Sequence, residues 1–118
     1  MAINEVFDNH PDKLSAVATH PTTPTLGGPA RLGQLPMVCI VTEGTDGIGT
    51  YAIQGVYDLS VKAIDAGGNS AVAVGDIIYY TDADTPPLSK KATGVRFGYA
   101  LEAITSGSTD TINVLIGY

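Results

Sequence analysis

The stretch YAIQGVYDLSVKA, residues 51–63, decides the fold class of this chain. The residues at odd positions of this stretch, apart from Gly55, are all apolar: Tyr51, Ile53, Tyr57, Leu59, Val61 and Ala63. Most residues at the even positions between Gln54 and Lys62 are polar. An alternation with a period of two is typical of a β-strand with one buried face. The stretch is longer than a usual strand, so we expect a bend or bulge at Gly55 that turns the strand around a corner.

Short apolar segments separated by Gly-rich turns continue on both sides of this stretch. We expect strands in ARLGQLP, MVCIVTE, AVAV, IIYY, GVRFGYALE and TINVLIGY, which lie between residues 30 and 118. At the corner formed by Val74, Gly75 and Asp76, Gly75 permits unusual dihedral angles and Asp76 can accept backbone N–H bonds. The pattern therefore predicts an all-β fold of seven or eight strands without a helix, a small antiparallel β-barrel or sandwich.

Residues 1–26 differ from the rest of the chain. The segment from His10 to Leu26 carries three Pro and four Thr, with no sustained periodicity. A residue that precedes Pro is driven toward extended geometry. We therefore predict an extended N-terminal arm over residues 1–26 and a β-domain over residues 27–118. The arm is either disordered or ordered by a surface on which it lies, and its best candidates for such a contact are its apolar residues, Ile3, Val6, Phe7, Leu14 and Val17.

The charge of the chain excludes several classes of partner. Its formal net charge is −6, with only six Lys and Arg residues in 118, and these form no basic patch. Nucleic-acid binding depends on Lys and Arg that neutralise phosphates, so we expect no nucleic-acid partner, and no anionic membrane surface. The N-terminus has no signal-peptide pattern and no apolar run reaches about 20 residues, which predicts a soluble product of the cytoplasm. The single Cys39 is expected to be a small buried apolar residue.

The loop between IIYY and GVRFGYALE holds the residues that most resemble a reactive site. Asp82 and Asp84 are spaced as in a calcium loop, but no late Glu follows them, and Asp is also a common turn former. Lys90 and Lys91 could be a catalytic base or a carrier lysine, yet they lack the setting of a biotinyl or lipoyl carrier. We expect a solvated lysine pair on one limb of a β-hairpin.

Other reactive residues are scattered. His10 and His20, the only histidines, each precede a Pro and have no Cys or His partner nearby. The glycines of GTDGIG, residues 44–49, lack the Lys and the helix of a phosphate loop. We therefore expect no catalytic residues, no cofactor and no metal.

Several strings taken together, in this order and spacing, resemble one known family. These strings are Gly55-Val56-Tyr57, Val74-Gly75-Asp76-Ile77-Ile78-Tyr79 and Gly98-Tyr99-Ala100-Leu101-Glu102, with ARLGQLPMVCIVTEG upstream. They resemble the bacteriophage head decoration, or capsid cement, proteins over residues 27–118. A departure is Met37-Val38-Cys39, where members of that family often have Gly-Val-Ala.

The resemblance implies a non-enzymatic virion protein that binds the major capsid protein on the outer surface of the assembled head. It further implies a homotrimer, with a dimer as the alternative. Under this hypothesis, deletion of residues 1–20 should leave a folded body that no longer decorates heads. A competing hypothesis is a β-sandwich that recognises carbohydrate through an exposed tyrosine, since Tyr79 and Tyr80 point to opposite faces of one strand; the absence of Trp speaks against it.

Overall fold

The computed structural model describes residues 13–42, 44 and 47–117. This part of the chain is all-β, as the sequence predicts, and forms eleven strands. They are β1 (Lys13–Ala16), β2 (Pro29–Leu32), β3 (Leu35–Val41), β4 (Gly49–Ala52), β5 (Gly55–Lys62), β6 (Ile64–Asp65), β7 (Gly68–Asn69), β8 (Ile77–Tyr80), β9 (Leu88–Ser89), β10 (Val95–Ala100) and β11 (Thr109–Ile116). Among the described residues, no helix has the length and apolar character that a membrane crossing requires.

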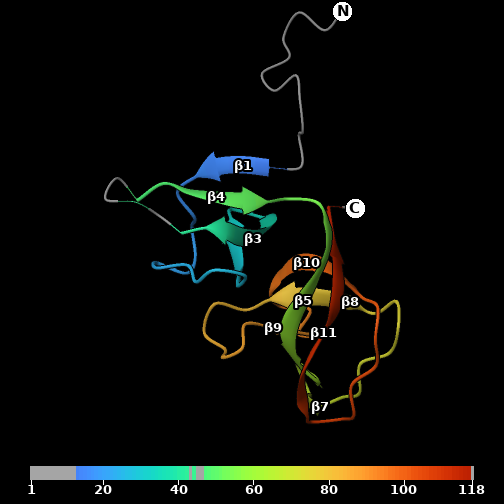
Figure 1. The fold of residues 1–118 in the computed structure, drawn as a ribbon. Coiled ribbons are helices and arrows are strands. Elements are labelled where there is room, and N and C mark those ends of the chain that lie inside the picture. Colours follow the sequence, from blue (N-terminus) through green and yellow to red (C-terminus); the bar gives the residue numbers. More distant parts are fainter. Residues whose placement is uncertain (1–12, 43, 45–46, 118) are drawn as a thin grey trace, which may run out of the picture.

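Four of the strands make an antiparallel sheet in the order β1-β4-β3-β2 (Figure 1). The β2–β3 hairpin turns at Gly33, whose φ of 60° lies in the left-handed region. One face of the sheet carries a small apolar cluster of buried residues, which are Ala30, Met37, Cys39 and Tyr51. Cys39 is thus a buried apolar residue, as the sequence predicts.

Five other strands close into a barrel in the order β10-β11-β5-β9-β8. Its longest ladder joins β5 to β11 over eight antiparallel residue pairs, from Lys62–Thr109 to Gly55–Ile116. The inward residues of the strands fill the barrel, because small aliphatic side chains on one parity meet at its centre. The buried core contains Leu59, Val61, Ala63, Ile78, Tyr80, Leu88, Phe97, Ala100, Ile112, Val114 and Ile116, among others.

The stretch 51–63 runs through both sheets. β4 ends at Ala52 in the four-stranded sheet, and β5 begins at Gly55 in the barrel. Gly55 has a φ of 126°, which favours glycine because other residues are strained there. The alternation continues across this corner, so its two halves bury their apolar residues in two different cores.

One predicted detail of the barrel is wrong, and another, the hairpin of β8 and β10, is correct in its pairing but incomplete. The predicted Ala/Val strand at residues 71–74 is reduced to one bridge, between Val72 and Ile104. The chain turns immediately afterwards at Gly75, with a φ of 91°, and the side chain of Asp76 accepts the N–H of Ala73 at 2.8 Å. This turn ends the pairing before a longer ladder can form.

The segment between β8 and β10 is more than a hairpin loop. Its residues Leu88 and Ser89 form β9, which pairs antiparallel with β8 and parallel with β5. Both residues are fully buried. The segment expected to be a loop therefore supplies the strand that closes the barrel. A strand of two residues is too short to show an alternation in the sequence, so it could not be predicted.

The N-terminal segment joins the four-stranded sheet from residue 13 onward. Lys13–Ala16 pair with β4 along one edge of that sheet, and the N–H groups of Thr19 and His20 bond to the carbonyl of Arg31 on β2, at the other edge. Ile3, Val6, Phe7 and His10 lie outside the described residues, and the division of the chain at residue 26 stays a prediction.

Candidate functional site

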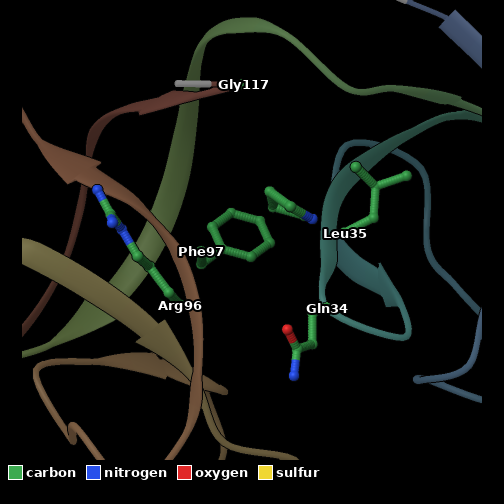
Figure 2. Close-up of a pocket in the computed structure, with 6 residues that line it drawn as sticks. Gln34, Leu35, Arg96, Phe97 and Gly117 are labelled. Carbon is green, nitrogen blue, oxygen red and sulfur yellow. The ribbon is translucent and has the colours of Figure 1, made fainter.

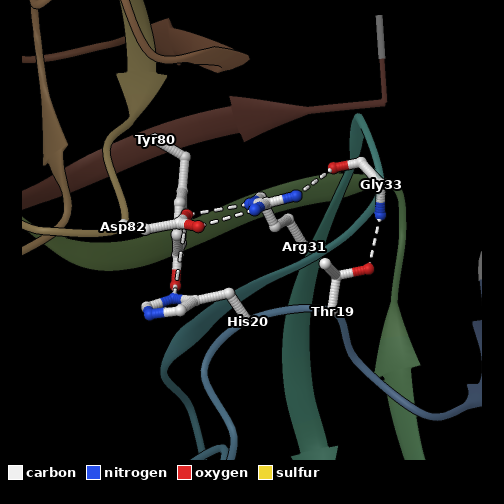
Figure 3. Close-up of polar contacts among 6 residues, drawn as sticks. All are labelled: Thr19, His20, Arg31, Gly33, Tyr80 and Asp82. Carbon is white, nitrogen blue, oxygen red and sulfur yellow. Dashed lines mark hydrogen bonds and ion pairs between the residues drawn. The ribbon is translucent and has the colours of Figure 1, made fainter.

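The strongest polar cluster of the described residues lies between the four-stranded sheet and the barrel (Figure 3). Arg31 of β2 forms a two-pronged pair with Asp82, which follows β8: Nε lies 2.9 Å from Oδ1 and Nη2 lies 2.6 Å from Oδ2. A third guanidinium nitrogen donates to the carbonyl of Gly33 at 2.9 Å. The planar guanidinium matches a carboxylate in this geometry, so the pair fixes the hairpin of β2 and β3 against the barrel.

This pair shifts the pKa of both partners in the direction that favours their charged forms. Hydrogen bonds from the Arg31 guanidinium lower the pKa of Asp82, and the same bonds raise the pKa of Arg31. Both shifts have the hydrogen bonds of the pair as their largest cause. The structure therefore accounts for Asp82 as the partner of Arg31, with both of its carboxylate oxygens in hydrogen bonds.

His20 and Tyr80 complete the cluster. The hydroxyl of Tyr80 lies 2.8 Å from Nδ1 of His20, and the two rings meet edge to face with centroids 5.5 Å apart. Burial, reinforced by the negative charge of Asp82, raises the pKa of Tyr80 to about 12. The hydroxyl therefore keeps its proton at neutral pH, and it joins the segment before β2 to the barrel core as a neutral hydrogen-bonding group.

The two lysines that follow β9 are held by carboxylates of the same chain. Lys90 Nζ lies 3.3 Å from Asp76 Oδ2 and also donates to the carbonyl of Ala71 at 2.8 Å. The N–H of Ala73 and the Lys90 ammonium lower the pKa of Asp76. Lys91 Nζ lies 2.8 Å from Asp84 Oδ2. Each residue of the loop that the sequence suggested as reactive thus has a structural partner.

These contacts are suited to holding segments together. No group of three or more His, Cys, Asp or Glu side chains in the described ranges could hold a metal ion. Tyr80 is buried and Tyr79 is half-buried, so neither forms the open aromatic platform that carbohydrate recognition uses.

Shallow hollows lie beside the junction of the sheet and the barrel in the described part of the chain. One, of about 340 Å³, is lined by His20, Tyr80, Asp82 and Asp84, among others. Another, of about 250 Å³, lies between the β2–β3 hairpin and β10, where Phe97 points toward Leu35 and Arg96 extends to the other side of the strand (Figure 2). Phe97 is itself almost completely buried, so little apolar surface is open to a small molecule there.

The predicted contact residues of the N-terminal segment separate into groups. Leu14 packs against the buried cluster of the four-stranded sheet, whereas the side chain of Val17 is 56% exposed. Val17 therefore has apolar surface to offer to another protein, and Leu14 has less because its own sheet uses it.

Sequence reasoning missed the Arg31–Asp82 pair and the strand β9. Arg31 and Asp82 are 51 residues apart, and neither stands in a motif that relates them. The signal lies only in the strand pairing, which brings the end of β8 next to β2.

Comparison with known proteins gives one result. A family model described as phage cement protein matches residues 13–116, which include all eleven strands. No curated protein and no solved structure matches the chain.

Proposed function

Because the chain belongs to the phage cement protein family, we propose that it binds the outer surface of the assembled phage head and stabilises the shell. Membership in this family makes the protein a capsid-associated structural component of the virion. In the proposed mechanism, each bound copy contributes weak contacts to the shell. Many copies together stabilise the shell strongly, since linked binding events reinforce one another through multivalency.

The observation that carries the proposal is the extent of the family match, from residue 13 to residue 116. It covers the four-stranded sheet and the barrel together, and so the whole body that would lie on the head. The Arg31–Asp82 ion pair and the His20–Tyr80 hydrogen bond hold the two sheets in a fixed arrangement. A fixed shape supports the proposal, since a cement protein must transmit load between capsid subunits. The proposed role requires no catalytic group.

We place the contact with the major capsid protein on the N-terminal segment, with Ile3, Val6, Phe7 and Val17 as anchors and Leu14 as a weaker one. The 56% exposure of Val17 supports this placement. Copies of the protein associate with one another on the head as a homotrimer, or alternatively as a dimer. Synthesis in the host cytoplasm precedes this binding.

A truncation tests the contact. A cut after residue 20 would remove β1 and the His20–Tyr80 contact, so the informative cut comes after residue 12. We expect the chain of residues 13–118 to fold, because the described sheets are complete within it, and to lose binding to mature heads that lack the protein. Co-sedimentation with such heads measures binding, and circular dichroism verifies folding.

A full-length variant tests whether binding to heads needs the apolar side chains of the N-terminal segment or only the presence of the segment. Replacing Ile3, Val6 and Phe7 together by Ser should weaken co-sedimentation at least tenfold, since each apolar anchor contributes about 1–2 kcal/mol when buried. The matched control replaces the polar Asn4 and Asn9 by Ser and should bind as the natural chain does. Full binding by the truncated chain would remove the N-terminal segment from the contact, and failure of the natural chain to sediment with heads would refute the proposed function.

A further inference from the structure

The outside of the barrel carries a continuous row of apolar side chains across four neighbouring strands. Strand pairing sets Val56 of β5 beside Leu115 of β11, and Leu115 beside Tyr99 of β10. Tyr99 in turn pairs with Ile77 of β8. Directly opposed residues of an antiparallel ladder lie on the same face, so these four side chains, here called the outer row, form one stripe.

The pleat confirms that the outer row faces away from the barrel core. The residues adjacent to it in sequence, such as Val114, Ile78 and Ala100, are buried inside the barrel. Val56 is 49% exposed, and the other three members are half-buried. Apolar and aromatic residues on an exposed strand face are typical of a surface that another protein covers.

The two edges of the outer row carry opposite charges. On one side, Arg96 pairs with Tyr79 across β10 and β8. On the other side, Asp58 pairs with Asn113 across β5 and β11, and Glu102 accepts the N–H of Asn113. We call the outer row together with these two edges the barrel face.

Arg96 is the cation of the barrel face, and it differs from the three cations of the polar contacts described above. Arg31, Lys90 and Lys91 each form an ion pair within the chain, whereas within the described ranges no carboxylate forms an ion pair with Arg96. Its guanidinium donates to the Tyr99 hydroxyl and lies over that ring, 5.0 Å from the centroid. Arg stacked on Tyr is a pairing that protein interfaces favour.

We propose that the barrel face binds a second copy of this chain. When two copies meet face to face about a two-fold axis that runs parallel to the outer row, the Arg96 edge of one lies against the Asp58 edge of the other. The apolar rows then cover each other. The inference deepens the dimeric alternative for self-association contained in the proposed function and rests on it, because a face that covers its own equivalent joins two copies.

Charge complementarity favours a second copy over other occupants. Each copy has a formal net charge of −6, which opposes the approach of two random surfaces. The barrel face carries Arg96 against Asp58 and Glu102, so little of that net charge lies on it. A partner with an acidic edge, an apolar stripe and a basic edge in the same arrangement is what another copy supplies.

Matched substitutions at two exposed valines test whether the outer row contributes to the association of two copies. We expect the natural chain to show at least twice the 12.2 kDa mass of one copy in light scattering at high micromolar concentration. Val56→Asp should shift it to the single-copy mass, with at least a tenfold loss of association. Val41→Asp, at a valine that is 57% exposed at the end of β3, should leave the mass unchanged, and circular dichroism verifies that both variants fold.

A charge reversal tests whether the partner of the barrel face is a second copy of this chain. Arg96→Glu sets two acidic edges against each other and should weaken association roughly tenfold or more, since like charges at an interface are strongly unfavourable. Adding Asp58→Lys should restore association. Because the two positions lie on opposite sides of the outer row in one copy, this rescue has to come from the neighbouring copy.

Three results would overturn the inference: a natural chain of single-copy mass, a Val56→Asp chain that associates normally, or an R96E/D58K chain that recovers nothing. Co-sedimentation of the same variants with heads is read separately. Loss of head binding at unchanged mass would assign the barrel face to the capsid and not to a second copy. Failure of the natural chain to bind heads while the mass shifts occur as expected would sink the proposed function alone.

Discussion

Asp82 is the residue whose role differs most between sequence and structure. In the sequence it is a turn-forming acid with the spacing of a calcium ligand, and in the structure both of its oxygens accept hydrogen bonds from Arg31. The bond from Arg31 holds the pKa of Asp82 below its ordinary value. A carboxylate with a depressed folded-state pKa stabilises the protein above its unfolded pKa, and this contribution disappears as the pH falls through the folded value.

Asp82→Asn should therefore lower the free energy of unfolding at pH 7 and have little effect in acid. We expect a loss of about 1 kcal/mol at most, because the Asp82 side chain is 42% exposed and solvent screens such pairs. Urea unfolding at pH 7 and at pH 3 measures the difference. The difference in free energy of unfolding between the two proteins should begin to narrow below about pH 4, where unfolded Asp gains its proton, and should vanish once the pH has fallen through the lower pKa of folded Asp82.

Asp110→Asn provides the control for this change, since Asp110 is exposed and its side chain accepts the N–H of the neighbouring Thr111 without a cation as partner among the described residues. The free energy of unfolding of this variant should differ from that of the natural chain by a similar small amount at pH 7 and at pH 3. Equal losses for both variants would mean that overall charge, and not the tie to Arg31, sets the effect.

At the scale of elements, one of the three two-residue strands is the one that closes the barrel. β9 consists of Leu88 and Ser89 and links β5 to β8. Leu88 is fully buried in the barrel core. A closed barrel has no exposed edge to pair with other chains, so this one short strand determines whether β5 and β8 are protected.

Leu88→Ala should destabilise the protein by about 2–5 kcal/mol, through lost burial and the cavity left behind. Hydrogen exchange should show the amides of β5 and β8 losing protection before those of the four-stranded sheet. Leu26→Ala serves as the control, because Leu26 is 70% exposed and surface changes cost about 0.5 kcal/mol or less. Uniform loss of protection over the whole chain would show that β9 does not close the barrel independently.

The sequence predicts long elements well and short ones poorly. The alternation in residues 51–63, 94–102 and 111–118 correctly predicts β4, β5, β10 and β11, because a period of two is visible over four or more residues. β6, β7 and β9 have only two residues each, too few for any period. The Arg31–Asp82 tie and the outer row depend on which strands become neighbours, and a single sequence does not contain that information locally.

At the scale of the whole molecule, the two sheets share part of their interior. Val38 belongs to β3 of the four-stranded sheet, yet it packs in the core of the barrel. Together with the polar cluster of Figure 3, this contact joins the sheets through both an apolar and a charged link. Elements that share a core tend to unfold as one unit.

Val38→Ala should reduce stability by about 2 kcal/mol, because two buried methyl groups are lost. The reduction should appear equally in the exchange of β3 and β10 amides if the two sheets open together. Val41→Ala removes the same atoms from an exposed position three residues away and should have little effect. Loss of protection in β3 alone would show that the sheets unfold separately.

The hairpin of β6 and β7 projects at the end of the barrel that lies away from the four-stranded sheet (Figure 1). Its tip residues Ala66 and Gly67 are exposed, and within the described ranges the two strands form a ladder with each other alone, with one further bond from the N–H of Lys90 to the carbonyl of Ile64. A guest peptide inserted between these two residues would lengthen a hairpin without interrupting either main sheet. If the protein binds the outside of the head, as proposed, such an insertion would turn the particle into a dense display of the guest, suitable for vaccine antigens or affinity tags.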